Sequence, residues 1–192
     1  MLELRKFIES YTTISESDWE TISDCFEHQE VDKNQIILNE GSICNHLYFL
    51  ESGLLRYFIN KDGNEITKFF TVAPYFFTSQ VSFNNQKPAS ENIQAIEKSV
   101  VWQITFQDSN KLFELESWTL FARKIIQEVQ YFTEQILEEM QSETAEFRYE
   151  KMLRNQAELT NRIPIKYLAS FLGIAPQSLS RVRKKLILKD KR

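Results

Sequence analysis

The sequence predicts an α+β chain in which an antiparallel β-roll, a double-stranded jelly roll, is followed by a long helix and then by an all-helical C-terminal domain. Three patterns lead to this prediction. Short apolar segments separated by glycine turns fill the first half of the chain, apolar residues then recur at steps of three and four, and the last quarter fits two short helices joined by a tight turn. We place the roll with its N-terminal helices at residues 1–114, the long helix at 115–141 and the C-terminal domain at 142–192.

The first part of the chain predicts two short helices and then a run of strands. Apolar residues repeat at helical spacing from Leu2, and Ser15 followed by Asp18 is a typical start signal for a second helix at residues 17–26. From about Glu27 the apolar spacing becomes that of β-strands. We expect strands around Val31 and at residues 36–38, 46–50, 54–59, 66–71, 75–77, 92–96 and 100–105, with turns at Gly41, Gly53 and Asp62-Gly63. Strands of this length joined by such turns are typical of an antiparallel roll or sandwich.

One face of the long helix carries an apolar seam with the spacing of a coiled coil. The seam consists of Leu115, Trp118, Ala122, Ile125, Val129, Phe132 and Ile136. Leu120, Phe121 and Ile126 lie outside the seam, so the helix has enough apolar surface to contact both its own roll and a second helix. We expect the seam to form the interface of a homodimer. The alternative is that the helix only packs on its own roll.

The most informative segment is residues 164–186, which fits two helices joined by a turn at Gly173. The second helix places Leu179, Val182 and Leu186 on one side. Polar and basic side chains cover the rest of that helix: Gln177, Ser178, Ser180, Arg181, Lys184 and Lys185. A helix of this kind fits the major groove of DNA, where Arg pairs with guanine, Gln with adenine, and Ser or Lys with phosphate. The alternative is a solvated basic helix on an ordinary helical bundle.

The positive charge of the chain is concentrated near its C-terminal end. Residues 141–192 hold twelve Lys and Arg against five Asp and Glu, a net charge of +7. The whole chain carries −4, so residues 1–140 carry −11. A basic end on an acidic protein is a local binding surface for a polyanion, because the acidic remainder repels DNA.

Composition and motifs argue against several other classes of protein. The chain is 42% hydrophobic and 26% charged, has no apolar run of the roughly 20 residues that a membrane span needs, and starts without a signal peptide. We therefore expect a cytoplasmic protein that contacts no membrane. The two cysteines and two histidines lack the spacing of a zinc or iron–sulfur site, so we expect no metal and no cofactor. No catalytic-triad order, glycine-rich phosphate loop or acid pair predicts an enzyme.

The order of these parts resembles the Crp/Fnr superfamily of bacterial transcription regulators over essentially all 192 residues. The most specific parts are YLASFLGIAPQSLSRVRKK at residues 167–185 and NEGSICNHLYFLESGLLRYF at residues 39–58. The resemblance implies a homodimer that binds double-stranded DNA at a two-fold-symmetric operator, with Gln177 and Arg181 in the base-reading positions. The residues expected to hold phosphates are Lys166, Ser178, Ser180, Lys184 and Lys185.

The nucleotide-binding cassette of that superfamily is degenerate in this chain. The best-known members bind a cyclic nucleotide through Gly-Glu and, nine residues after the Glu, Arg-Ser-Ala. Aligned on residues 74–95, these motifs become Thr78-Ser79 and Pro88-Ala89-Ser90, so every charged contact is gone. A phosphate that leaves water without a cationic partner loses more free energy than a few backbone hydrogen bonds restore. We therefore expect no useful affinity for cAMP or cGMP.

Residues in and near the cassette leave two interpretations of the roll interior open. The region in which an effector would lie is lined by Phe70, Phe77, Thr78, Ser79, Pro88, Ala89 and Ser90. The aromatic residues could enclose a cavity for an unknown apolar or planar effector, or they could form only the core of the roll. A second hypothesis for the whole chain is accordingly a small-molecule sensor whose basic tail docks a protein or an RNA.

Overall fold

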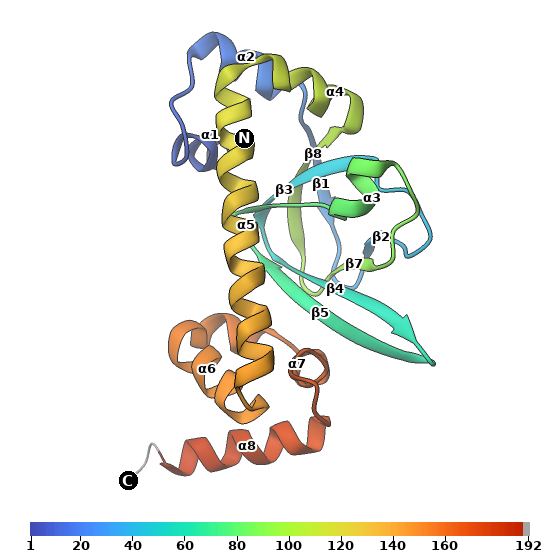
Figure 1. Cartoon of the computed structure of the whole chain (residues 1–192), viewed down its shortest axis with the longest axis vertical. Helices are drawn as coiled ribbons and strands as arrows, with labels where there is room; N and C mark the ends of the chain where they lie inside the picture. Colours follow the sequence, from blue (N-terminus) through green and yellow to red (C-terminus); the bar gives the residue numbers. More distant parts are fainter. Residues whose placement is uncertain (190–192) are drawn as a thin grey trace. The chain divides into compact units, whose positions relative to one another are not determined.

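The computed structural model describes residues 1–189 and divides into two compact units (Figure 1). Unit 1 consists of Met1–Tyr57 and Phe70–Gln130, and unit 2 of Phe58–Phe69 and Tyr131–Arg192. Three charged residues of the basic end predicted from the sequence, 190–192, lie outside the described residues. Residues 58–69 of one β-hairpin thus belong to the same unit as the C-terminal helices. The units are not continuous in sequence, so the domain boundaries expected at 114 and 141 remain predictions.

Two short helices open unit 1. α1 spans Leu2–Glu9 and α2 spans Glu16–Asp24. The Ser15 side chain accepts a hydrogen bond from the Asp18 N–H at 3.0 Å, which confirms the predicted start signal of α2. Both helices bury apolar side chains in the core of the unit.

Two sheets form the roll, which confirms the predicted fold class. In the described chain each sheet has four strands, in the orders β1-β8-β3-β6 and β2-β7-β4-β5. The pairs β1–β8, β3–β8, β3–β6 and β2–β7 run antiparallel. The strands are β1 (Glu27–Val31), β2 (Ile36–Leu38), β3 (His46–Ser52), β4 (Leu54–Lys61), β5 (Asn64–Val72), β6 (Tyr75–Phe77), β7 (Asn92–Ala95) and β8 (Ser99–Thr105). Helical segments also occur at α3 (Gln80–Asn85), α4 (Phe106–Lys111) and the 3₁₀ turn η1 (Leu112–Glu114).

Gly53 joins β3 to β4 and shows why a glycine is needed at this turn. Its φ is 113°, a conformation that disfavours side chains, and a Cβ at this position would lie 2.1 Å from Ser99 Oγ. The backbone conformation and the close approach of β8 both require glycine. The turn predicted at Gly53 is therefore confirmed.

The core of unit 1 is aromatic and receives the first turns of α5 (Glu116–Ser142). Trp118 is only 1% exposed, and its ring centroid lies 6.3 Å from that of Phe26 and 6.2 Å from that of Phe76. The prediction that Trp118 belongs to a dimer seam is therefore wrong, because the core of its own chain already encloses this side chain. Apolar residues at steps of three and four serve a helix that packs on a core as well as a coiled coil, so spacing could not separate the two roles.

In unit 2, α6 (Ala145–Arg162) is a kinked helix. It begins at Thr144, whose side chain accepts a hydrogen bond from the Phe147 N–H at 3.2 Å. Gln156 has non-helical angles (φ −145°, ψ 51°), and the Thr160 hydroxyl donates to the Gln156 carbonyl at 2.8 Å. Helical turns resume after the kink and continue to Arg162.

The segment predicted to form two helices around Gly173 contains α7 (Ile165–Leu172) and α8 (Pro176–Lys189). Gly173 adopts the left-handed conformation (φ 73°) and ends α7, as predicted. Leu172 and Leu179 are buried between the elements of unit 2. In addition, the Arg148 guanidinium of α6 donates to the Leu172 carbonyl at 2.9 Å, which satisfies a backbone oxygen at the end of α7.

Candidate functional site

α8 presents a polar surface on the side away from its buried residue. Leu179 is fully buried, while Gln177, Ser178, Arg181 and Lys184 are exposed. Gln177 and Arg181 are four residues apart, so they lie one above the other on the same face of the helix. This arrangement leaves a guanidinium and an amide side by side and open to a ligand.

Other basic side chains near α8 have partners within unit 2. Lys185 Nζ pairs with Glu146 Oε1 at 2.7 Å, and this carboxylate raises the pKa of Lys185. The Arg183 guanidinium donates to Asn161 Oδ1 at 2.6 Å, and Lys166 Nζ lies 4.5 Å from the centre of the Tyr167 ring. Such exposed pairs exchange readily with water and ions, so these cations stay accessible to a stronger anion.

Ser180 is the predicted phosphate contact that the geometry supports least. Its side chain is half-buried, and its hydroxyl donates to the Pro176 carbonyl at 3.0 Å within the helix. The donor that a phosphate would need is therefore already used. Of the sequence-predicted contacts on α8, Gln177, Ser178, Arg181 and Lys184 have the open positions.

The cassette segment, residues 74–95, is closed by hydrogen bonds among its own residues. Ser79 is 1% exposed, and its hydroxyl donates to Glu91 Oε1 at 2.6 Å. Glu91 is itself only 8% exposed. A buried carboxylate therefore occupies the interior of the cassette.

The backbone around Ala89 is also bonded within the chain. The Ala89 N–H donates to the Ser42 carbonyl at 2.8 Å, and the Gly41 N–H donates to the Ala89 carbonyl at the same distance. Pro88 forms a bridge with Ile43. The peptide groups that would face an effector in this loop are thus used to join it to residues 41–43.

The aromatic residues of the roll belong to its core. Phe77 is buried and stacks on Tyr48, with ring centroids 4.8 Å apart and planes inclined by 12°. The buried Tyr57 hydroxyl donates to the Thr78 carbonyl at 3.2 Å, and burial raises the pKa of Tyr57 well above its ordinary value. Phe70 is half-buried. These contacts favour the interpretation of the aromatic cluster as core packing.

Glu91 and Tyr57 are the two residues of this region that reasoning from the sequence missed. Glu91 follows directly after the aligned Pro88-Ala89-Ser90 motif, yet nothing in the sequence indicates that its carboxylate turns inward to Ser79. Tyr57 lies in β4, whose first five residues, 54–58, are all buried. The run of apolar residues in this strand was the available signal, but it did not identify the partner of the Tyr57 hydroxyl.

The first half of α5 is held on unit 1 by a carboxylate clamp. The Tyr11 hydroxyl donates to Glu128 Oε2 at 2.6 Å and the Tyr75 hydroxyl to Glu128 Oε1 at 3.2 Å. Burial and the Glu128 charge raise the pKa of Tyr75 to about 12. Both tyrosines therefore stay protonated donors at neutral pH. Because Tyr75 lies in β6, the clamp joins α5 to the strand that leads into the cassette.

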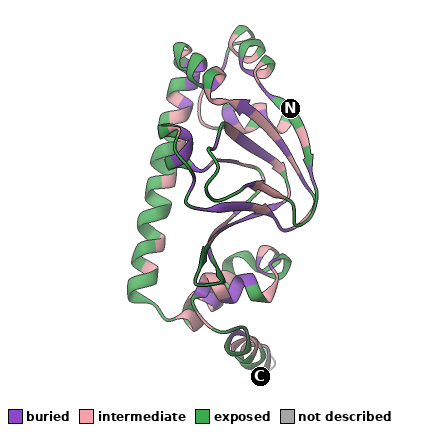
Figure 2. Cartoon of the chain, turned by 90° about the vertical axis from the view of Figure 1, so that its right-hand side faces the viewer, coloured by how far each residue is buried: buried purple, intermediate pink, exposed green. Residues whose placement is uncertain are grey.

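The predicted seam of α5 is only partly available to a partner. Leu115 and Ile125 pack against the core of unit 1 in addition to Trp118. Apolar side chains nevertheless remain exposed along the helix, and Figure 2 draws much of α5 as exposed. Ile126 and Phe132 are 53% and 55% exposed, and further exposed apolar residues are Tyr131, Leu137 and Met140.

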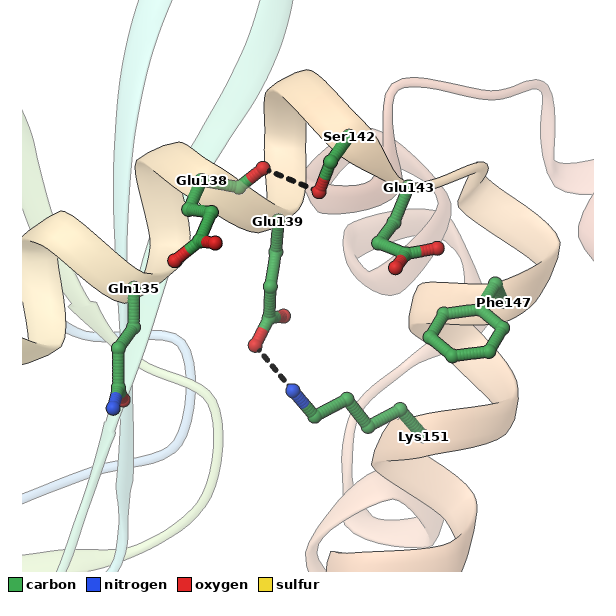
Figure 3. A pocket seen from close by; sticks show the side chains of 7 residues that line it. All are labelled: Gln135, Glu138, Glu139, Ser142, Glu143, Phe147 and Lys151. Carbon is green, nitrogen blue, oxygen red and sulfur yellow. Dashed lines mark hydrogen bonds and ion pairs between the residues drawn. The ribbon is translucent and has the colours of Figure 1, made fainter.

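A shallow hollow of about 330 Å³ lies where α5 meets α6 (Figure 3). It is lined by Gln135, Glu138, Glu139, Ser142, Glu143, Phe147 and Lys151. Lys151 Nζ pairs with Glu139 Oε1 at 2.6 Å, which raises the pKa of Lys151. Three carboxylates against one lysine make this surface acidic, so it repels the anions that α8 attracts.

Two further classes of site were considered in the described residues. No group of three or more His, Cys, Asp or Glu side chains there lies close enough to hold a metal ion, and Cys25 and Cys44 are free thiols. Among the same residues, no helix combines the length and the hydropathy of a bilayer-crossing segment.

Comparison with known proteins identifies the roll and the fold. Residues 28–116 match the family model of the cyclic nucleotide-binding domain. A comparison with curated proteins finds no significant match.

Solved structures resemble the chain over most of its length. A putative transcriptional regulator of the Crp/Fnr family from Eubacterium rectale has a TM-score of 0.72 at 18% identity, covering 92% of this chain and 85% of that one. FixK2 from Bradyrhizobium japonicum has a TM-score of 0.70 at 16% identity, covering 86% of each chain. A mutant of CooA from Carboxydothermus hydrogenoformans has a TM-score of 0.69 at 16% identity, covering 88% of this chain and 79% of that one. Residues 28–116 are therefore similar to the cyclic nucleotide-binding domain, and the chain has the fold seen in the Crp/Fnr family regulators.

Proposed function

We propose that this chain is a transcription regulator that binds a two-fold-symmetric DNA operator as a homodimer, and that cAMP does not control it. The observation that carries the proposal is the surface of α8. Its apolar side is buried at Leu179, while Gln177 and Arg181 are exposed one turn apart. A helix fixed in this way can enter the major groove with both side chains at the base edges.

The residues of α8 divide into two roles in the proposed complex. Arg181 is suited to guanine O6 and N7, and Gln177 to adenine, because each can form two hydrogen bonds with its base. Ser178 and Lys184 are suited to phosphates, which position the helix without reading sequence. Lys166 and Lys185 join them once their present partners are exchanged for phosphate.

The exposed apolar side chains of α5 support the homodimer. Ile126 and Leu137 lie on the same side of the helix with half or more of their surface in solvent, and a second copy of α5 would remove that surface from water. Two copies of α8 about 34 Å apart would then meet successive major grooves on one side of the duplex. Two-fold symmetry of the protein requires a matching symmetry in the operator.

The closed cassette supports the absence of control by cAMP. A cyclic phosphate entering the cassette would approach the buried Glu91 carboxylate, and two like charges at low dielectric repel strongly. The Ala89 N–H, which could otherwise bond a phosphate, already donates to Ser42. We expect isothermal titration to detect no binding of cAMP or cGMP, and sub-millimolar binding of either nucleotide would contradict this part of the proposal.

Selection of bound fragments from fragmented genomic DNA tests the proposed function directly. The purified chain should enrich fragments that share a two-fold-symmetric motif, and the Arg181→Ala/Lys184→Ala double variant should not enrich them. Equal enrichment by both proteins would show that α8 does not read DNA. Absence of any enriched motif with the unaltered chain would reject the function itself.

A further inference from the structure

Ser170 of α7 makes two hydrogen bonds to the backbone of β5. Its hydroxyl oxygen accepts from the Thr67 N–H at 2.9 Å, and its hydroxyl hydrogen is donated to the Glu65 carbonyl at 3.0 Å. Residues 65, 67 and 170 all lie in unit 2. One side chain of the helical domain is therefore matched, as donor and as acceptor, to two backbone groups of a strand.

These two backbone groups lie on the free edge of a sheet. β5 is the last strand in the order β2-β7-β4-β5, so one of its edges has no neighbouring strand. A carbonyl and an N–H two residues apart point to the same edge of a strand. Thr67 is buried, so its N–H is shielded from water and needs a partner from the protein, whereas Glu65 is exposed. The Ser170 hydroxyl fills the place of a neighbouring strand.

The hairpin of β4 and β5 has a two-residue turn, and both strands extend into unit 1. Asp62 and Gly63 have φ angles of 52° and 78°, the two positive values of a type I′ turn, which fixes the pairing of β4 with β5. β4 and β5 both run from unit 1 into unit 2. In β4, Tyr57 is the residue whose hydroxyl bonds the Thr78 carbonyl of the cassette. β4, the neighbour of the edge strand β5, therefore also contacts the cassette.

We propose that Ser170 is a latch that docks α7 on the edge of β5 and thereby fixes α8 for DNA binding. The position of α8 depends on that of α7. Gly173 joins the two helices through a single tight turn, and Leu172 and Leu179 are buried in the same unit. Gln177 and Arg181 are exposed while the latch is closed, so the latched arrangement leaves both side chains open to DNA. A change in the roll that moves β5 is transmitted to α7 at this contact. This inference rests on the proposed function.

The latch is tested first without DNA, by hydrogen–deuterium exchange of the Thr67 amide. Ser170→Ala removes both hydrogen bonds while alanine keeps the helix, so the variant should fold and unfold cooperatively at a somewhat lower temperature. We expect the Thr67 amide to exchange about tenfold faster in this variant. Ser142→Ala is the matched control, because Ser142 is an exposed helical serine of the same unit whose hydroxyl bonds only its own helix.

The second measurement is affinity for an operator obtained by selection. Ser170→Ala should bind this duplex about tenfold more weakly than the unaltered chain, whereas Ser142→Ala should bind equally well. Unchanged exchange at Thr67, or faster exchange with unchanged affinity, overturns the latch while leaving the proposed function intact. Failure of the unaltered chain to bind any DNA overturns the proposed function, and the role of the latch in DNA binding with it.

Discussion

The cassette segment and α8 both carry polar side chains, but most of those of the cassette are bonded within the chain and most of those of α8 are exposed to solvent. In the cassette, the Ser79 hydroxyl and the Ala89 N–H bond inward to Glu91 and Ser42. On α8, Gln177 and Arg181 face solvent. The difference teaches that a buried polar group already bonded within the chain is not available to a ligand, whereas an exposed one is. We therefore expect substitutions in the cassette to change stability, and substitutions on α8 to change DNA binding.

The largest effect is expected from the exposed face of α5. Ile126→Glu combined with Leu137→Glu, two residues on the same side of the helix, should give monomers by sedimentation and lower operator affinity more than about 100-fold, since each α8 alone contacts half the site. Both side chains are exposed, so the melting temperature of the chain should stay near that of the unaltered protein. A variant that remains dimeric would place the interface outside this face.

The next effect is expected from the open site on α8. Arg181→Ala should lower operator affinity by about 1–3 kcal/mol and relax the preference at one base pair, as measured by competition with single-base operator variants. Lys184→Ala is the matched comparison. It should weaken binding to all sequences alike and reduce the slope of log affinity against log salt by about one. If Arg181→Ala left the base preference intact, Arg181 would not be a reading residue.

A substitution in the cassette should lower the stability of the chain and leave DNA binding unchanged. Ser79→Ala removes the shorter of two hydroxyl hydrogen bonds to the buried Glu91 carboxylate, which should lower the free energy of unfolding by about 1–3 kcal/mol in urea denaturation. Operator affinity of the folded variant should stay unchanged. A variant with full stability but weaker DNA binding would show that the cassette takes part in regulation and is not merely closed.

The smallest effect concerns the carboxylate clamp, in which the Tyr11 and Tyr75 hydroxyls donate to Glu128. The pKa of Tyr75 is raised from its ordinary value near 10 to about 12, so the folded state favours the protonated hydroxyl. The stability from this group is complete below pH 10 and is lost as the pH rises from about 10 through 12. Tyr75→Phe should make the unfolding free energy of the chain less sensitive to pH in that window. An unchanged pH profile would exclude the clamp as a source of stability.

Reasoning from the sequence reached most of the fold because local signals were strong. Ser15 before α2 and Gly173 after α7 each act through the backbone of their own turn, which the sequence alone specifies. The alternation of apolar residues and the turn at Gly53 placed the strands for the same reason. The polar face of α8 could be read in advance because one buried residue, Leu179, determines which side of a helix faces out.

The error at Trp118 arose because one pattern serves two kinds of packing. Trp118 has the spacing of a coiled-coil residue, but it lies in the core beside Phe26 and Phe76. Ser180 stays a predicted phosphate contact, but its hydroxyl already bonds the Pro176 carbonyl. In both cases the deciding fact is the identity of the neighbouring atoms, which sequence spacing does not contain.

By itself, the sequence determined the order of helices and strands, the acidic body with its basic end, and the loss of the charged contacts of the cassette. These properties depend on residue identity and on neighbours a few positions away. Only the tertiary structure decided that Glu91 closes the cassette, that Trp118 is a core residue and that Ser170 meets the edge of β5. Each of these contacts joins residues distant from one another along the chain or on separate elements, and only the packing of the whole chain selects such partners.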